Sequence, residues 1–417
     1  MRLGTITNLR FRRYHVISVG IDVSKGKSTV CILKPNEDFV CKPFELLHNK
    51  EDLELLDELL QKLDGEVKVV MEATGIYNLP ILTFLVEKDY FVSVINPCVM
   101  KKYARNNNFR NVKTDKHDSI TIANYGIEKW FKLQKYERSG LEYEELKLLG
   151  RRYRHYMEMH VAALQELTHM LDYVMPGIKG MFNSWTESNS RDKLCDFVER
   201  FWHYDLITAM SCEEFVKAYN DWAKEKKYHQ NESKARQVYE LASNGIPTLP
   251  SNIPSTKMLV LEAINSLRTA DDSLNAILTR MKELAKSLPE YSTVRAMGRV
   301  GDVLSVKLIA EIGDIRRFHS AKALIAYAGI DPPPHESGQF VGNKRKISKK
   351  GSSTLRKVGY ELMRVLKSHG KPKDAAVYDY ILKKESEGKS KKQAKIAGLN
   401  KFLHIYYARV TEVYQQA

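Results

Sequence analysis

The sequence is poor in cysteine, and the few cysteines it has are scattered. None of the five (Cys31, Cys41, Cys98, Cys195 and Cys212) belongs to a C-x-x-C pair, so neither a zinc site nor a disulfide framework is indicated. No apolar run reaches the roughly 18 residues that span a bilayer, and the N-terminus lacks the apolar stretch of a secretion signal. We therefore expect a soluble, cytoplasmic protein with reduced thiols and no membrane partner.

An acidic balance is also missing, because the chain is strongly basic. Its 417 residues carry a formal net charge of +15, which favours a polyanion as partner, nucleic acid first. Residues 339–395 contain 17 Lys and Arg against 5 Asp and Glu, so most of the excess lies in one C-terminal stretch. The length predicts two or three domains, and 43% hydrophobic residues are enough for their cores.

The N-terminal third alternates between apolar runs and helical spacing. The patterns predict strands at 15–22, 28–33, 39–44, 66–72 and 90–95, and helices at 49–63, 77–88 and 115–125. Pro43 favours an edge position for the third strand. Three strands with short links, followed by alternating helices and strands, are typical of a ribonuclease H-like fold.

Four acidic residues in this region are the main candidates for chemistry. Asp22 follows the first apolar run, Glu72 ends the strand at 66–72, and Asp115 and Asp118 lie three residues apart where a helix is predicted to begin. Gathered carboxylates repel each other and are stable only with cations between them. Hard oxygen ligands suit Mg²⁺ or Mn²⁺, and paired ions of this kind are common in phosphodiester chemistry. The pattern therefore predicts a metal-dependent nucleic-acid enzyme.

Heptad spacing predicts two long helices in the middle of the chain, at 146–174 and 260–288. They can pair with each other as an antiparallel stalk or pair across subunits, and a small helical insert is expected between them. We predict three domains. Their boundaries are 14–135 for the acidic domain, 136–288 for the stalk with its insert at 177–255, and 289–417 for a mainly helical C-terminal domain.

The C-terminal region carries the predicted nucleic-acid contacts. A helix, a turn with Gly298 and Gly301, and a second helix capped by Asp302 look like a helix-hairpin-helix, whose turn holds a backbone phosphate. The alternative is a plain helix turn with glycine at the C-cap. Further helices are predicted at 321–327, 353–367 and 391–414. The predicted contacts are Gly298, Arg299, Gly301, Lys344, Arg345, Lys346, Lys349, Lys350, Arg356 and Lys357.

Several sequence blocks resemble one known family. The segments 20–25, 71–75 and 113–118 are similar to the three motif blocks of the DEDD insertion-sequence transposases, which are relatives of the Piv/MooV-like invertases and are also called bridge-RNA-guided recombinases. Five more blocks follow in that family's order, at 297–301, 310–314, 326–330, 337–338 and 347–351. The resemblance covers roughly residues 16–128 and 290–370. Met297 stands where the family often has Pro, and the chain is long for the family, with its surplus in the insert.

The resemblance implies a fold, a cofactor and a mechanism. The N-terminal domain is expected to be RuvC-like, with Asp22, Glu72, Asp115 and Asp118 as catalytic ligands of Mg²⁺, and the C-terminal domain is expected to supply Ser337 as a nucleophile. His117 and His335 flank these positions as candidates for proton transfer. The implied partners are donor and target double-stranded DNA, a structured guide RNA, and further copies of the chain in a dimer or tetramer. The implied setting is the nucleoid of a prokaryotic cell, and acids and serine could come from different subunits.

Three other functions are compatible with parts of the pattern. A structure-selective nuclease, such as a Holliday-junction resolvase, would use the same four acids without a serine. The segment 20–24 also resembles a phosphate loop of actin-like sugar kinases, although neither a duplicated core nor later glycine-rich nucleotide loops are found. A non-catalytic DNA-binding scaffold would need only the basic residues.

Overall fold

The structure is a computed structural model. It describes residues 16–73, 75–107, 114–138, 140–182, 192–332, 336–337, 340–341, 346–368 and 370–416. The chain divides into two compact units, residues 1–138 and 139–417, and each is described by itself. The first combines a sheet with helices and the second is mostly helical, so the mixed α/β class with a large helical part is confirmed. None of the described helices has both the length and the apolar composition needed to cross a membrane.

The first unit contains one sheet and its covering helices. Its elements are β1 (Val16–Val23), β2 (Lys27–Leu33), η1 (Pro35–Glu37), β3 (Phe39–Leu47), α2 (Lys50–Gln61), β4 (Glu66–Glu72), α3 (Leu79–Glu87), β5 (Phe91–Ile95), α4 (Pro97–Asn107), α5 (Asp115–Glu128) and η2 (Trp130–Lys132). The predicted order of strands and helices is confirmed, with one addition. Helix α4 was missed because Pro97 indicated the end of a strand, whereas proline is also favoured in the first helical turn.

The five strands form a mixed sheet in the order β3-β2-β1-β4-β5. β1 pairs with β2, and β2 with β3, in antiparallel fashion, whereas β1, β4 and β5 are parallel. β3 lies at the edge, as Pro43 predicts. Because Ile21 pairs with Met71 across β1 and β4, Asp22 and Glu72 follow side by side at the same end of the sheet.

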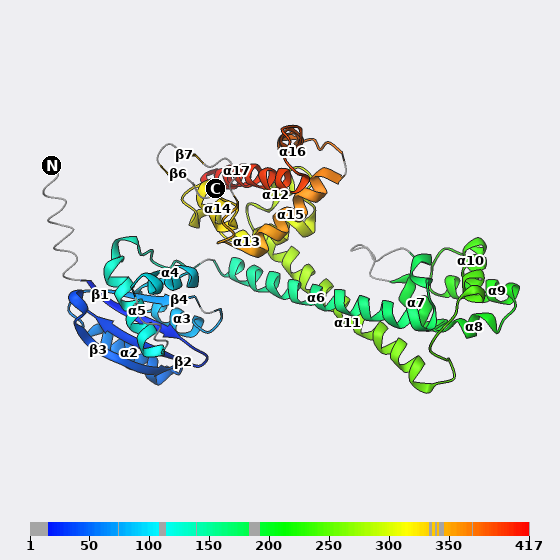
Figure 1. Cartoon of the computed structure of the whole chain (residues 1–417), viewed down its shortest axis with the longest axis horizontal. Helices are drawn as coiled ribbons and strands as arrows, with labels where there is room; N and C mark the ends of the chain where they lie inside the picture. Colours follow the sequence, from blue (N-terminus) through cyan, green and yellow to red (C-terminus); the bar gives the residue numbers. More distant parts are fainter. Residues whose placement is uncertain are drawn as a thin grey trace. The chain divides into compact units, whose positions relative to one another are not determined.

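The two faces of the sheet are covered by different helices (Figure 1). On one face, Ile21 and Met71 pack with apolar residues of α2 and α3. On the other face, Cys31 of β2 packs with Ala123 of α5, and Val70 of β4 packs with Ile122. Since successive side chains of a strand point to opposite faces, Asp22 and Glu72 lie on the α5 face.

Two glycines allow α5 to lie directly against β1. A Cβ on Gly20 would overlap with the backbone nitrogen of Ala123 and the carbonyl oxygen of Ser119, and a Cβ on Gly126 would overlap with the hydroxyl of Ser18. Residue 126 thus lies beside residue 18, and residues 119–123 lie beside residue 20. Helix and strand therefore run in opposite directions, and the start of α5 lies near the end of β1.

The second unit consists of two long helices with smaller helices at each end. Its elements are α6 (Leu141–Val174), η3 (Ile178–Met181), α7 (Lys193–Arg200), α8 (Tyr204–Thr208), α9 (Cys212–Glu225), α10 (Glu232–Asn244), α11 (Pro254–Ser287), α12 (Tyr291–Arg295), α13 (Asp302–Ile312), η4 (Ile315–Arg317), α14 (Ala321–Ala328), β6 (Glu336–Ser337), β7 (Phe340–Val341), α15 (Ser353–Ser368), α16 (Ala376–Ser386) and α17 (Lys391–Gln416).

Helices α6 and α11 pair with each other as an antiparallel stalk, one of the two arrangements that the heptad spacing left open. Leu146, near the start of α6, shares an apolar cluster with Met281, near the end of α11. Val174, at the end of α6, shares a second cluster with Val260 near the start of α11. Between the two clusters, the buried ring of His160 lies 2.5 Å from the carboxylate of Asp271 (Nδ1 to Oδ1).

Each end of the stalk carries its own group of helices (Figure 1). Helices α7–α10 pack at the end of the stalk where α6 ends and α11 begins. They surround buried aromatic residues, among them Phe197, Phe215 and Trp222. Helices α13–α17 pack at the opposite end, where α6 begins and α11 ends, and share one apolar cluster with the stalk. Helix α16 was not predicted from the sequence, whereas the helices predicted around it are present.

One predicted helix cap is wrong. Gly301, not Asp302, is the N-cap of α13, and α13 begins at Asp302. The carboxylate of Asp302 instead lies 2.6 Å from Nε of Arg295, in the short helix before the turn. The carboxylate of Asp302, which the sequence pattern predicted to cap the helix, thus forms an ion pair across the turn.

We predict that Gly20→Ala destabilises the protein by about 1–3 kcal/mol or more, because the added methyl group pushes α5 away from β1. Chemical denaturation of the wild-type and variant chains measures this loss. Gly180→Ala is the control, since a Cβ there meets no heavy atom within 4 Å. Equal stability of the Gly20→Ala variant and the wild type would contradict the close packing of helix and strand.

Candidate functional site: an acidic edge of the sheet

Two strands bring Asp22 and Glu72 to one edge of the sheet. Asp22 is the penultimate residue of β1 and Glu72 is the last residue of β4. The strands are parallel neighbours, so both carboxylates emerge at the same end and on the face that α5 covers. Both side chains are partly exposed, which leaves this edge open to a ligand.

The first turn of α5 contributes Asp115 and Asp118. The hydroxyl of Thr114 caps the helix by accepting a hydrogen bond from the backbone N–H of His117 (3.2 Å). The positive end of the helix dipole favours acidic residues in this turn. Because α5 runs opposite to β1, the turn lies beside Asp22.

The charges of the other three acids affect the pKa of Asp22. Burial, followed by the charges of Asp118, Asp115 and Glu72, raises the pKa of Asp22 from 3.8 to about 6. Burial and then Asp118 also raise the pKa of Glu72. The carboxylates of Asp118, Asp115 and Glu72 are therefore close enough to Asp22 to oppose its ionisation.

A divalent ion fits this edge in charge and in donor type. Carboxylate oxygens are hard ligands, and a cation would relieve the repulsion that raises the pKa of Asp22. Within the described ranges, however, no group of three or more His, Cys, Asp or Glu residues is arranged to hold a metal ion. The acids are gathered at one edge without the ligand geometry of a formed metal site.

The two flanking histidines differ in what the structure describes. Nε2 of His117 is buried and has no hydrogen-bond partner. His335 lies outside the described residues. His117 follows Asp115 by two positions on α5, so the two side chains point to different sides of the helix.

Ser337 lies in a two-stranded ribbon of the second unit. It belongs to β6, where it pairs with Phe340 of β7. The structure describes its backbone and not its side chain. The ribbon is part of the long segment between α14 and α15.

The two ends of this segment are joined by a set of hydrogen bonds that the sequence did not reveal. The Ser348 hydroxyl donates to the carboxylate of Asp331 (2.6 Å), and the Lys349 N–H donates to the carbonyl of Gly329 (3.0 Å). Gly351 packs so closely on the end of α14 that a Cβ there would overlap with the carbonyl oxygen of Tyr327. We call residues 327–331 with 348–352 the loop clasp. It closes the base of the segment that carries Ser337.

The predicted nucleic-acid contacts occupy different surroundings. Gly298 has a φ of +61° in the turn between α12 and α13, and Nε of Arg299 is buried without a hydrogen-bond partner. Nη1 of Arg356 donates to the carbonyls of Ala328 and Gly351, both at 3.0 Å, so this guanidinium supports the loop clasp. Gly301 is the N-cap of α13. The exposed lysines of the set are Lys346, Lys349, Lys350 and Lys357, whereas Lys344 and Arg345 lie outside the described residues.

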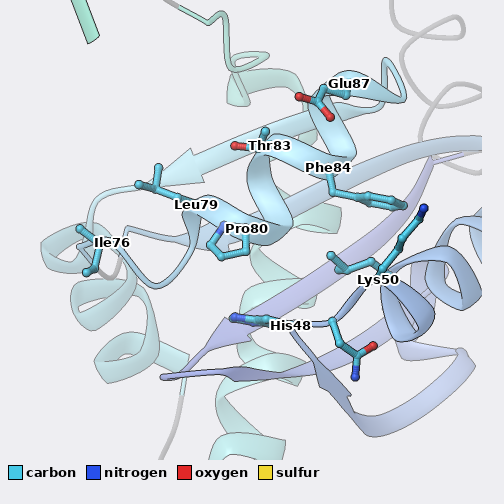
Figure 2. A pocket seen from close by; sticks show the side chains of 10 residues that line it. His48, Lys50, Ile76, Leu79, Pro80, Thr83, Phe84 and Glu87 are labelled. Atoms are coloured by element: carbon cyan, nitrogen blue, oxygen red, sulfur yellow. The ribbon is translucent and has the colours of Figure 1, made fainter. Parts of the chain in front are cut away.

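The first unit also has a cavity of about 550 Å³ on its other face. In Figure 2, Leu79, Pro80 and Phe84 line it from α3, Lys50 lines it from the first residue of α2, and His48 lines it from the turn between β3 and α2. None of the predicted site residues lines this cavity. It lies beside the helices that cover the face opposite to Asp22 and Glu72.

Comparisons with known proteins match both an N-terminal and a C-terminal part of the chain. A family model of IS110-type DEDD transposases, described as a transposase, matches residues 19–176. A second model, the transposase IS116/IS110/IS902 family, matches residues 291–379. The pilin gene-inverting protein of Moraxella bovis is 23% identical over 398 residues, which cover 94% of this chain and 95% of the relative. The transposase for insertion sequence element IS1111A of Coxiella burnetii is 29% identical over 185 residues, 42% of this chain and 48% of the relative.

The two matching family models and the named relatives define a DNA transposase, an enzyme of DNA recombination. Both models describe IS110-type insertion-sequence transposases, one over an N-terminal and one over a C-terminal part of the chain. The predicted resemblance to this family is thereby confirmed. DEDD transposases use divalent metal ions in general.

We predict that Asp22→Asn stabilises the metal-free protein at neutral pH. Because the folded-state pKa of Asp22 is raised from 3.8 to about 6, the folded protein holds more protons than the unfolded chain between these values. Stability therefore falls as pH rises from about 4 to 6. The variant should unfold about 2–4 °C higher than the wild type above pH 6 in EDTA, which allows for solvent screening of a partly exposed group.

Thermal unfolding at pH 4 and pH 7 measures this difference, which should shrink at pH 4. The control is Asp89→Asn. Asp89 is exposed and pairs with Lys135 (2.6 Å), and the resulting hydrogen bond lowers its pKa. This variant should gain no stability at pH 7. An Asp22→Asn variant no more stable than wild type at pH 7 would contradict the mutual repulsion of the acids.

Proposed function

We propose that the transposase cuts and rejoins DNA strands with a divalent-metal site at the acidic edge and with Ser337 as nucleophile. The acids Asp22, Glu72, Asp115 and Asp118 would hold the ion, Mg²⁺ or Mn²⁺, in a ribonuclease H-like, RuvC-type domain. The observation that carries this proposal is the position of the four acids: Asp22 and Glu72 lie at the ends of parallel neighbouring strands, and the first turn of α5, with Asp115 and Asp118, lies beside them. Such a cluster gains stability when a cation neutralises it.

The serine chemistry follows the family resemblance. The hydroxyl oxygen of Ser337 forms a bond to a DNA phosphorus while the bond from phosphorus to the 3′ oxygen breaks, and the 3′ oxygen takes up a proton. A bound divalent ion would stabilise the negative charge of the transition state. Because the phosphoserine link keeps the energy of the phosphodiester bond, reversal of the attack can join a new 3′ hydroxyl without ATP. The loop clasp supports this role by closing the base of the Ser337 segment.

The exposed lysines would hold the DNA backbone during these steps. Lys346, Lys349 and Lys350 follow the Ser337 ribbon in the chain, and contacts of this type give affinity with little sequence discrimination. The turn at Gly298 to Gly301 would add a phosphate contact of the helix-hairpin-helix type. A transposase of this kind acts at the nucleoid, in the cytoplasm of a prokaryotic cell.

Ser337→Ala separates the recombinase from the alternative of a RuvC-type nuclease. We expect the variant to lose the covalent protein–DNA adduct and strand joining, and Asp22→Ala to lose strand cutting by about 10²-fold or more. Labelled DNA substrate, Mg²⁺ and denaturing gels measure all three. Ser386→Ala, an exposed serine whose hydroxyl donates to a carbonyl of its own helix, is the control.

Each outcome selects one function. Cutting that survives Ser337→Ala without an adduct supports a nuclease instead of a serine recombinase. Cutting that survives Asp22→Ala excludes the acidic edge as the catalytic site. Mixtures of the two inactive chains that regain activity support a site shared between subunits of a dimer or tetramer, and no recovery counts against it.

We further propose that a structured RNA guides the choice of DNA sites, as the family resemblance implies. The lysine contacts described above select no sequence, so selection needs another source. We expect an RNA of defined sequence to purify with the protein. We also expect ribonuclease treatment to abolish site-specific joining, while formation of the covalent Ser337–DNA link on a nicked substrate continues. Sequencing of the bound nucleic acid is the measurement. Unchanged site choice after complete RNA removal would contradict guidance.

A further inference from the structure

A groove lies where the stalk meets the C-terminal helices. It has a volume of about 380 Å³ and is lined by residues of α6 and by the first turn of α15. Arg154 of α6 bridges the two elements, because its Nη1 donates to the hydroxyl of Thr354 at 2.6 Å. The two residues are 200 positions apart in the chain, so only the folded unit forms this surface.

The stalk side of the groove carries two arginines and a histidine at helical spacing. Arg151, Arg154 and His155 lie three and four positions apart, so they share one face of α6, and all three side chains are exposed. Lys357 adds a positive charge one turn into α15, also exposed. Among the described residues that line the groove, Glu158 is the one acidic residue.

These cations differ from other arginines of the same unit. Arg280 of the stalk pairs with Glu145 (3.0 Å), and Arg316 pairs with Asp314 (2.7 Å). Arg151, Arg154 and Lys357 make no ion pair with a carboxylate in the part of the chain that the structure describes. Like charges held close together repel each other, and in the described part of this unit Glu158 forms an ion pair with none of the three, so an external anion would reduce that repulsion.

The other groups at the groove also suit an anion. Ser353 and Thr354 place two hydroxyl groups in the first turn of α15, at the end of the helix that carries the positive pole of its dipole. Arginine forks bind phosphate oxygens through two parallel hydrogen bonds. A surface of arginine, lysine and hydroxyl groups matches a phosphodiester backbone.

We propose that this groove binds the phosphate backbone of a nucleic acid and that Arg151 and Arg154 of the stalk act in it together with Lys357. The inference rests on the proposed function and adds the stalk to its nucleic-acid contacts. The α15 side of the groove begins at Ser353, the residue that follows the loop clasp. A backbone held there is held by the same compact unit that carries the Ser337 segment. The phosphodiester backbone is common to DNA and RNA, and the test distinguishes the two.

The test is equilibrium binding of the full-length Arg151→Ala/Arg154→Ala double variant to a DNA duplex and to an RNA hairpin at several salt concentrations. We expect the slope of log affinity against log salt to fall by about 2, roughly one for each arginine, and affinity at low salt to fall by roughly 10-fold or more. A loss confined to one probe identifies which nucleic acid the groove holds. Arg151→Ala alone, which breaks no bond to α15, should lower the slope by about 1.

Arg280→Ala is the matched control, since it removes the same charge from the same stalk but from an arginine with carboxylate partners. Affinity and slope of the double variant equal to those of the wild type, or equal to those of Arg280→Ala, would overturn the proposal. Thermal unfolding of each variant shows whether the stalk is intact, and the single variant decides the matter if the double variant unfolds.

The same preparations keep this inference separate from the proposed chemistry. If Asp22→Ala still cuts DNA while the double variant loses binding, the metal site is wrong and the groove stands. If Asp22→Ala fails to cut while the double variant binds as the wild type does, the groove is wrong and the metal site stands.

Discussion

The contact between α5 and β1 is the constraint on which the candidate acidic site depends. Gly20 and Gly126 have no side chain, so the backbone of the helix reaches the backbone of the strand. This contact brings the first turn of α5 to the edge of the sheet where β1 and β4 end. Four carboxylates from three elements then gather there, and burial together with their mutual repulsion raises the pKa of Asp22 to about 6. The protein thus holds a cluster that a cation would stabilise, at an edge open to solvent.

The second unit shows how a long stalk can position a reactive loop. The antiparallel pair of α6 and α11 buries one apolar cluster at each end, and the polar pair of His160 and Asp271 lies between the clusters. A single buried polar pair can specify the register of two helices, because any shift leaves a polar group without its partner. The apolar cluster at the start of α6 and the end of α11 continues into α13–α17. The loop clasp and the arginines of the stalk groove therefore belong to one packed structure.

Much of the secondary structure could be predicted, because it follows from local patterns. The order of strands and α-helices along the first unit (apart from α4), the edge position of β3 and the two heptad helices are present as predicted. The errors also have physical causes. Pro97 begins α4, although it indicated the end of a strand. The carboxylate of Asp302 pairs with Arg295 across a turn, so it does not cap its own helix. A capping pattern considers only residues that are neighbours in one helix, whereas this ion pair joins two elements.

The sequence by itself determined the periodicities, the positions of the four acids at the ends of predicted elements, and the basic C-terminal stretch. It also determined the family, through motif blocks that lie in order along the chain. Tertiary structure alone decided that α5 lies against β1, that the two long helices pair with each other, and that Arg154 meets Thr354 across 200 positions. Periodicity is a local property of neighbouring residues, whereas these contacts depend on which surfaces pack together and how closely their backbones can approach.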